Sequence, residues 1–242
     1  MRSQAEIKEI EHELIHGKGW VILDSDHPEK LEELKSVIFG AIQGFPGLSH
    51  LQSIDEFREH LKSMPESEIN TLKLYLLKVQ GLSFLLQEAF QETTEGLVGK
   101  EFFLQRRPHV MFNIPGIKNT SVMHHIEAMS GISPFTYVLW APIHDILDNS
   151  GIYVVDQKRS MELMNESRAQ GEVMGDSVLN FKCDPVRMRF GQGAIFNPYV
   201  IHGSVEAAGP LARIGVTNRF QSVAKPLFLR NSDFFYPCSF HR

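Results

Sequence analysis

The stretch Met123–Asp145, MHHIEAMSGISPFTYVLWAPIHD, places a histidine and a glutamate two residues apart in a segment rich in strand-forming side chains. Successive side chains of a strand point to opposite faces, so His125 and Glu127 are expected to share one face. An imidazole and a carboxylate on an inner face supply two ligands of a 2-His-1-carboxylate site, which binds non-haem Fe(II) and leaves other positions open. We therefore predict a strand over 122–127 and metal ligands at these two residues.

The third ligand has to come from a distant strand, and we nominate His202. It follows the strand-like run 194–197 and lies eleven residues before Arg213. An arginine in a protein interior is costly unless paired, and its planar fork suits a carboxylate bound through two parallel hydrogen bonds. Counting by two along the following strand places three residues on the face of Arg213, namely Gly215, Thr217 and Arg219.

Other histidines in the chain fit a metal site less well. A second His-x-Glu pattern at 27–29 contains proline and is typical of a helix start, with Ser25 or Asp26 as the cap. His124 is next to the nominated ligand and should face the other way. His144 is a weaker candidate than His202 because no arginine follows it at a suitable distance.

Composition narrows the class of protein. The chain has 242 residues, of which 43% are hydrophobic and 22% charged, enough for one domain with a sizeable core. A formal net charge of −5 gives no reason to expect nucleic acid or a membrane surface as a partner. Cys183 and Cys238 do not make a disulfide framework, and the polar N-terminus is not a signal peptide. We expect a cytoplasmic protein that is a monomer or a homodimer.

The pattern of apolar residues changes near residue 100. Before it, apolar residues at helical spacing predict helices over about 4–16, 28–42, 54–62 and, as one long helix, 66–94. A short apolar run predicts one strand at 20–23. After it come short strand-like runs separated by Gly, Pro, Asn and Asp, at 102–104, 110–114, 122–127, 135–140, 152–155, 194–197 and 214–220.

Helices followed by many short strands predict an α+β fold. We expect helices packed outside a double-stranded β-helix, or jelly-roll, core of the cupin type. The chain should form a single domain over 1–242, with helical support over about 1–100, the core over about 101–222 and a C-terminal extension over 223–242.

Four stretches share their order and spacing with a known family. They are HHIEAMSGISP (124–134), YVLWAPIHDILDNSGIYVVD (137–156), FGQGAIFNPYVIHGS (190–204) and the strand from Arg213 to Phe220. Together they span roughly half the chain and resemble the Fe(II)/2-oxoglutarate oxygenases of the phytanoyl-CoA hydroxylase superfamily. The resemblance is strongest to the small bacterial members found in carbohydrate gene clusters.

The resemblance implies a function and roles for four residues. His125, Glu127 and His202 match the Fe(II) ligands, and Arg213 matches the anchor of the co-substrate 2-oxoglutarate. With O2 as the second co-substrate, such an enzyme releases succinate and CO2 and oxidises its substrate, here most readily by hydroxylation.

Two positions depart from the family pattern. The carboxylate ligand is Glu127 where Asp is commoner, and Gly215 stands where Ser or Thr is frequent. The hydroxyl missing at Gly215 should be replaced, as a contact to 2-oxoglutarate, by Thr217 or by a residue of an earlier strand such as Asn113.

The substrate is the least determined part. The insert between residues 156 and 190 either covers the mouth of the site or forms a solvated loop; its basic residues are Lys158, Arg159, Arg168, Lys182, Arg187 and Arg189. Over the mouth they would favour a small polar substrate, either a saccharide or an anionic metabolite. Two other function classes are open: a non-catalytic jelly-roll protein that binds a metal or small molecule, and a cupin-type metal-dependent isomerase. Arg213 argues against the isomerase, and an intact ligand triad argues against the non-catalytic protein.

Overall fold

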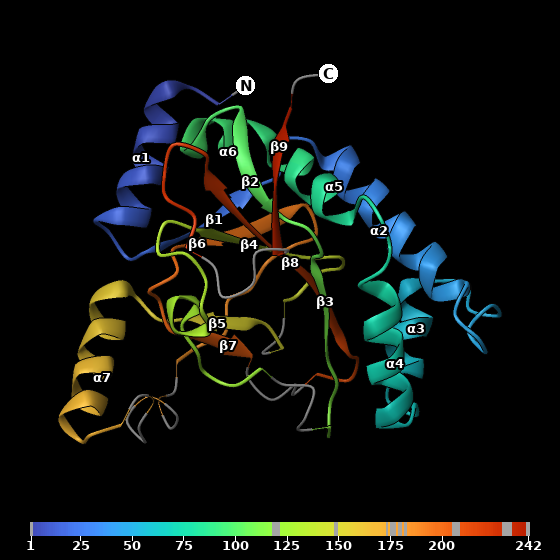
Figure 1. The fold of residues 1–242 in the computed structure, drawn as a ribbon. Helices are drawn as coiled ribbons and strands as arrows, with labels where there is room; N and C mark the ends of the chain where they lie inside the picture. The colour runs from blue at the N-terminus through green and yellow to red at the C-terminus, as the bar shows by residue number, and fades with distance from the viewer. Residues whose placement is uncertain are drawn as a thin grey trace.

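The structure is a computed structural model and describes residues 2–117, 122–147, 150–172, 174, 178, 181, 183–204, 209–228 and 234–240. Its helices are α1 (Gln4–Ile15), α2 (Pro28–Gln43), α3 (Ile54–His60), α4 (Glu66–Leu76), α5 (Leu82–Ala89), α6 (Gln91–Val98) and α7 (Gln157–Ala169), with a 3-10 turn, η2, at Glu127–Ser130. Its strands are β1 (Trp20–Asp24), β2 (Glu101–Gln105), β3 (His109–Asn113), β4 (Tyr137–Pro142), β5 (Ile152–Val154), β6 (Gln192–Phe196), β7 (His202–Ser204), β8 (Arg213–Ser222) and β9 (Phe235–Ser239) (Figure 1).

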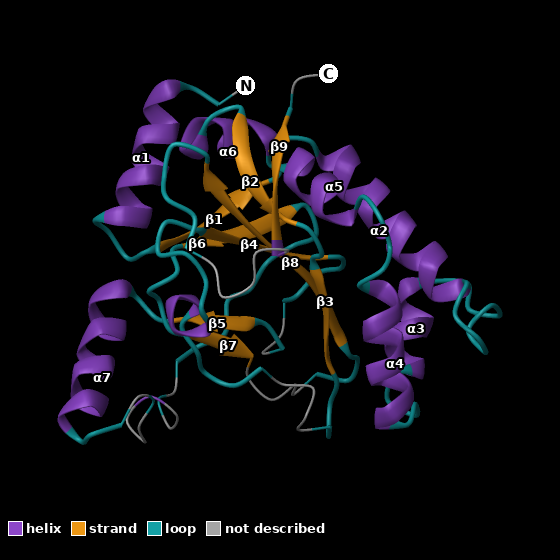
Figure 2. Ribbon diagram, in the orientation of Figure 1, coloured by secondary structure: helices purple, strands orange, loops and turns teal. Residues whose placement is uncertain are grey.

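The strands form two antiparallel sheets (Figure 2). The seven-stranded sheet has the order β1-β6-β4-β8-β2-β9, with β3 pairing on β8. Strand β8 organises this sheet, because β4 pairs along one of its edges while β3 and β2 share the other. β5 and β7 form the two-stranded sheet, which lies below β1, β6 and β4 in Figure 1. The mixture of helices with antiparallel sheet agrees with the predicted α+β class.

The main core lies between the helices and the larger sheet. Helices α4, α5 and α6 contact its strands, and α1 packs on β1 and α6. Buried side chains from both layers meet there, as in the edge-on contact of the Phe57 and Phe112 rings, whose centroids are 5.6 Å apart. In the described part of the chain no helix is both long and apolar enough to cross a bilayer.

The predicted long helix over 66–94 is wrong, because three shorter helices occupy it. Gly81 precedes α5 with φ +82°, a left-handed conformation that a continuous right-handed helix excludes. Phe90, between α5 and α6, also leaves helical geometry, at φ −122° and ψ 37°. The other predicted helices and the strand at 20–23 are confirmed with shifted ends. Helix α7 lies in the insert between residues 156 and 190, which was expected either to cover the mouth of the site or to form a solvated loop.

The predicted strand over 122–127 is also wrong. His125 makes only a single bridge, to His202, and Glu127 begins the turn η2. The backbone turns there because the Ala128 N–H donates to Pro198 O at 3.1 Å, outside both sheets, and Gly131 ends the turn at φ +81°. The other predicted strands are present, whereas β7 and β9 were not predicted as strands.

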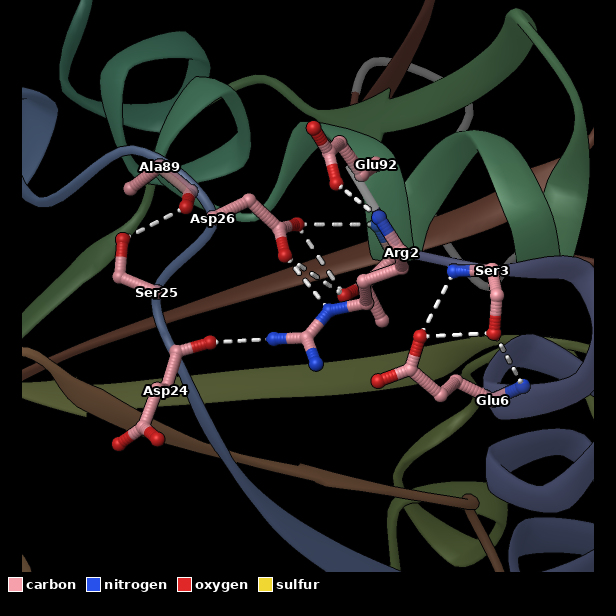
Figure 3. Close-up of polar contacts among 9 residues, drawn as sticks. Arg2, Ser3, Glu6, Asp24, Ser25, Asp26, Ala89 and Glu92 are labelled. Atoms are coloured by element: carbon pink, nitrogen blue, oxygen red, sulfur yellow. Dashed lines mark hydrogen bonds and ion pairs between the residues drawn. The ribbon is translucent and has the colours of Figure 1, made fainter.

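The residues before α2 fix the N-terminus instead of capping the helix. Arg2 Nε donates to Asp26 Oδ1 at 2.6 Å, and Ser25 Oγ donates to Ala89 O at 2.7 Å (Figure 3). The actual N-cap is His27, which makes no side-chain cap bond, so the cap predicted at Ser25 or Asp26 is wrong. Both side chains are instead used to tie this loop to the N-terminus and to the end of α5.

Candidate metal centre

Two histidines far apart in the chain are held side by side by their backbones. The N–H of His125 donates to the carbonyl of His202 and the reverse bond is also made, both at 3.0 Å. Paired residues of antiparallel segments project their side chains to the same side. The two imidazole centroids are consequently 4.1 Å apart.

Each imidazole is oriented by a carbonyl two residues earlier. His125 Nδ1 donates to Met123 O at 2.9 Å, and His202 Nδ1 donates to Val200 O at 3.0 Å. Because a carbonyl only accepts, Nδ1 carries a proton in both rings, so the neutral form of each ring has its lone pair on Nε2. Burial lowers the pKa of His202, which keeps this ring neutral and able to bind a metal.

Glu127 completes the group. Its Oε1 lies 3.8 Å from His125 Nε2 and 3.6 Å from His202 Nε2. The three ligand atoms lie within 4.8 Å of one another, and in the described residues no other histidine joins them. Two imidazoles that each direct Nε2 toward one carboxylate fit the donor set of a non-haem Fe(II) centre.

The carboxylate of Glu127 forms an ion pair with Arg219, which was not predicted from the sequence. Arg219 Nε donates to Glu127 Oε2 at 2.9 Å, and Arg219 Nη2 donates to Oε1. Burial acts to raise the pKa of Glu127, but the charge and the hydrogen bonds of Arg219 outweigh it and hold that pKa well below its ordinary range. The carboxylate is therefore ionised, which is the form that binds a metal.

Arg213 is buried with most of its hydrogen-bonding capacity unused. Its side chain is 1% exposed, and Nη2 donates to Ser204 Oγ at 2.7 Å. Nε and Nη1 have no hydrogen-bond partner among the described residues. The Trp140 ring lies 5.5 Å from the guanidinium carbon. Burial lowers the pKa of Arg213 to about 10, so the group remains charged at neutral pH.

The three candidate metal ligands and Arg213 line one cavity of about 430 Å³. Its polar lining comprises His109, His125, Glu127, Ser130, His202, Ser204, Arg213, Thr217 and Arg219. Its apolar lining comprises Met111, Val122, Ile132, Trp140, Ile152, Phe196 and Phe234, besides Gly131 and Gly203. One ionised carboxylate and two guanidinium groups thus share a largely apolar chamber.

The alternation predicted for 213–220 is observed. Arg213, Thr217 and Arg219 line the cavity, and Gly215 lies under Trp140. A Cβ on Gly215 would lie 2.5 Å from Trp140 Cζ2, so the indole occupies the room that a larger residue would need. Asn113 pairs with Arg213 across β3 and β8 and is fully buried, but it is not among the described residues that line the cavity.

The remaining predicted residues lie elsewhere. His124 faces away from the ligands and contacts Phe181 O at 3.0 Å. His144 accepts a hydrogen bond from the Ile214 N–H at 2.9 Å. None of the described residues of the insert 156–190 lines the cavity, and Lys182 lies outside the described residues.

Several solved structures are similar to this chain in fold. The chain is similar to the non-heme alpha ketoglutarate dependent carbocyclase SnoK from nogalamycin biosynthesis, with TM-score 0.57, 11% identity, and 98% of this chain and 97% of that chain covered. It is also similar to apo ThoJ, a non-heme monooxygenase, with TM-score 0.53, 12% identity and coverage of 96% and 85%. A third similar structure is the epimerase SnoN with Fe3+, alpha ketoglutarate and nogalamycin RO, with TM-score 0.52, 11% identity and coverage of 91% and 85%.

At such low identity the likeness concerns the fold. The chain therefore has the fold of non-haem iron, 2-oxoglutarate-dependent enzymes. No protein-family profile matches the sequence, and no curated protein sequence matches it.

Proposed function

We propose that the protein is an Fe(II)- and 2-oxoglutarate-dependent dioxygenase that oxidises a small metabolite, with hydroxylation the expected outcome and succinate and CO2 released. One observation carries the proposal: a His-Glu-His group shares one cavity with a buried arginine, two of whose nitrogen donors have no partner among the described residues. The two sheets would then be the walls of a double-stranded β-helix, with the core over about 101–222 carrying every candidate ligand.

The metal would be held by the Nε2 atoms of His125 and His202 and by the Glu127 carboxylate. Bound Fe(II), supplied with 2-oxoglutarate and O2, provides the oxidising chemistry. The protein keeps both imidazoles in the tautomer with a free Nε2 and keeps the carboxylate ionised, so no proton has to leave the carboxylate for a metal to enter.

Arg213 would bind the 5-carboxylate of 2-oxoglutarate. Nη1, which has no partner among the described residues, can make a forked, charge-assisted contact with a carboxylate together with the second N–H of Nη2. Ser204 and Trp140 restrict the guanidinium from two sides, and the low exposure keeps water from competing. A buried cation with unused donors is costly by itself, and this cost favours an anionic ligand.

Thr217 is the residue we assign to the contact that Gly215 does not make. It lines the cavity on the face of Arg213, and its hydroxyl can donate to a co-substrate oxygen. Asn113 stays a prediction, as a neighbour of Arg213 across β3 and β8.

The substrate is proposed to be a small polar metabolite, either a saccharide derivative or an anionic compound. His109 and Ser130 place polar groups in this largely apolar chamber. A cupin-type isomerase would leave the free donors of Arg213 without a partner, and a non-catalytic protein would not need the complete ligand group.

The experiment is turnover with Fe(II), 2-oxoglutarate and O2 against a library of saccharides and small anions. We expect a compound that couples succinate formation to equimolar O2 uptake, and His202→Ala should lose both. Conversion of a compound without 2-oxoglutarate would favour the isomerase instead.

A further inference from the structure

We propose that Arg219 is a positioning residue for the metal centre: it holds the Glu127 carboxylate in its binding orientation, and Gln105 holds Arg219. This inference rests on the proposed metal site. It assigns a function to a buried ion pair that neither the metal ligands nor the 2-oxoglutarate contact accounts for.

Glu127 needs such a partner because its backbone does not fix it as the histidine backbones do. His125 and His202 are locked by their mutual backbone pair and by carbonyls at positions 123 and 200. Glu127 instead begins η2, a single 3-10 turn outside both sheets. Among the described residues, the hydrogen bonds to its carboxylate come from Arg219 alone.

A chain of buried side chains connects this carboxylate to the centre of the larger sheet. Arg219 Nη1 donates to Gln105 Oε1 at 2.9 Å, and Gln105 Nε2 donates to the backbone carbonyl of Arg107 at 2.5 Å. Gln105 is 0% exposed, Glu127 2% and Arg219 8%. The paired strands β2 and β8 carry Gln105 and Arg219, so the orientation of Glu127 is set by the sheet.

The orientation that results is the one a metal needs. Oε1, held by Arg219 Nη2, is the oxygen that faces the Nε2 atoms of both histidines, while Oε2 takes the Nε donor. Both oxygens are engaged, which removes rotation about the last side-chain bond. Forked arginine–carboxylate contacts are the side-chain pairs with the greatest geometric specificity.

Two effects of Arg219 on metal affinity have opposite signs, and this makes the inference testable. A positive charge near a divalent cation weakens binding, so removal of the charge alone would strengthen it. Orientation of a ligand by an outer partner strengthens binding, and loss of such a partner commonly costs about 10–100-fold in affinity. The buried, forked and supported geometry favours the second effect.

The experiment is titration of metal-free protein with Co(II) in the absence of 2-oxoglutarate, followed by calorimetry and by the visible absorption of bound Co(II). We expect Arg219→Gln to raise the Kd about 10–100-fold and to alter the Co(II) spectrum as a ligand is lost. Arg219→Lys keeps the charge but not the fork and should also bind weakly. Gln105→Leu, which leaves Arg219 and Glu127 in place, should show a smaller loss.

Arg213→Gln is the matched control, because it removes a buried guanidinium from the same strand and cavity without touching Glu127. Its Co(II) affinity should stay close to that of the unchanged protein. An Arg219→Gln Kd that is equal or lower would overturn the inference, as would full affinity in Arg219→Lys.

Circular dichroism and thermal unfolding show whether each variant is folded. If Arg219→Gln is not folded, the Co(II) affinity of Gln105→Leu tests the inference instead. His202→Ala separates the two proposals. If it retains Co(II) affinity, the metal site itself is misassigned; if it loses affinity while Arg219→Gln does not, only the function of Arg219 is misassigned.

Discussion

The guanidinium of Arg213 donates from Nη2 to Ser204 Oγ at 2.7 Å, which joins the first residue of β8 to the last residue of β7. His202 begins the same short strand β7, so the element that presents a metal ligand also orients the arginine. The proposed metal and co-substrate sites therefore share one three-residue strand.

Arg213→Leu should raise the 2-oxoglutarate concentration needed for half-maximal turnover by at least about 30-fold, because breaking a buried charge pair commonly costs about 2–5 kcal/mol. The measurement is the dependence of turnover on 2-oxoglutarate. Arg159→Leu, on the exposed face of α7, is the control and should change nothing. An unchanged dependence in Arg213→Leu would remove Arg213 from the site.

The same substitution should increase the free energy of unfolding when 2-oxoglutarate is absent. The buried guanidinium has two donors without described partners, and replacing such a group with an apolar one is often stabilising, by about 1–4 kcal/mol. Urea unfolding with and without 2-oxoglutarate tests this. At the same concentration, 2-oxoglutarate should stabilise the unchanged protein more than Arg213→Leu. A variant less stable than the parent without ligand contradicts the expectation.

Gly215→Ser, which introduces the residue frequent in the resembling family, should be harmful here. Its Cβ would meet Trp140 at 2.5 Å, and overpacking of a buried site typically costs about 1–3 kcal/mol. We expect lower thermal stability and weaker 2-oxoglutarate binding. The double variant Gly215→Ser with Trp140→Phe should recover part of the stability. Wild-type stability in the single variant would show that the indole is not a barrier.

The fold was predictable where local patterns decide it. Apolar spacing predicts α1, α2 and α3, and the period of two predicts which residues of β8 face the cavity. Apolar spacing does not predict that α4 ends at Leu76 or that Gly81, before α5, adopts a positive φ, because the spacing continues past both residues. Strand β9 was not predicted, because its pairing with β2 joins two segments that are distant in sequence.

In the candidate site, too, the sequence predicts part of the arrangement, and the rest depends on contacts between distant segments. Residue types and their order were sufficient to nominate His125, Glu127 and His202, which the structure brings together, although a bridge and a 3-10 turn replace the expected strand. The Arg219–Glu127 pair was not found. Period counting places Arg219 on the correct face, but only the packing of η2 against β8 shows which side chain it meets.

His125→Ala, Glu127→Ala and His202→Ala should each abolish turnover and sharply lower Fe(II) retention, because each removes one of three ligands. His27→Ala is the control and should retain both, since the His27 side chain lies near the surface, 3.5 Å from Glu29 and outside the proposed metal site. Metal content after gel filtration gives the measurement. Full Fe(II) retention in His202→Ala would rule out the ligand assignment.

The free energy of unfolding should decrease as the pH falls from about 6.5 to about 4. Burial, with the nearby charge of Arg58, lowers the pKa of His144 from 6.5 to about 4. The unfolded chain binds a proton in this window and the folded chain does not, so acid favours unfolding. For a pKa difference of that size the full effect is roughly 3 kcal/mol.

The contribution of His144 is isolated by His144→Gln, whose amide oxygen can still accept from the Ile214 N–H. Urea unfolding at several pH values should give this variant a shallower pH dependence than the parent. Equal slopes would exclude His144 as a source of the acid sensitivity.

Anaerobic addition of 2-oxoglutarate to the Fe(II)-loaded protein tests the central claim most directly, because it requires no knowledge of the substrate. A 2-oxo acid chelated to Fe(II) produces a visible charge-transfer absorption. We predict that this absorption develops at one 2-oxoglutarate per protein, needs a higher concentration in Arg213→Leu, and is lost in His202→Ala. Absence of the absorption from the unchanged protein, with Fe(II) shown to be bound and 2-oxoglutarate in excess, would contradict the account.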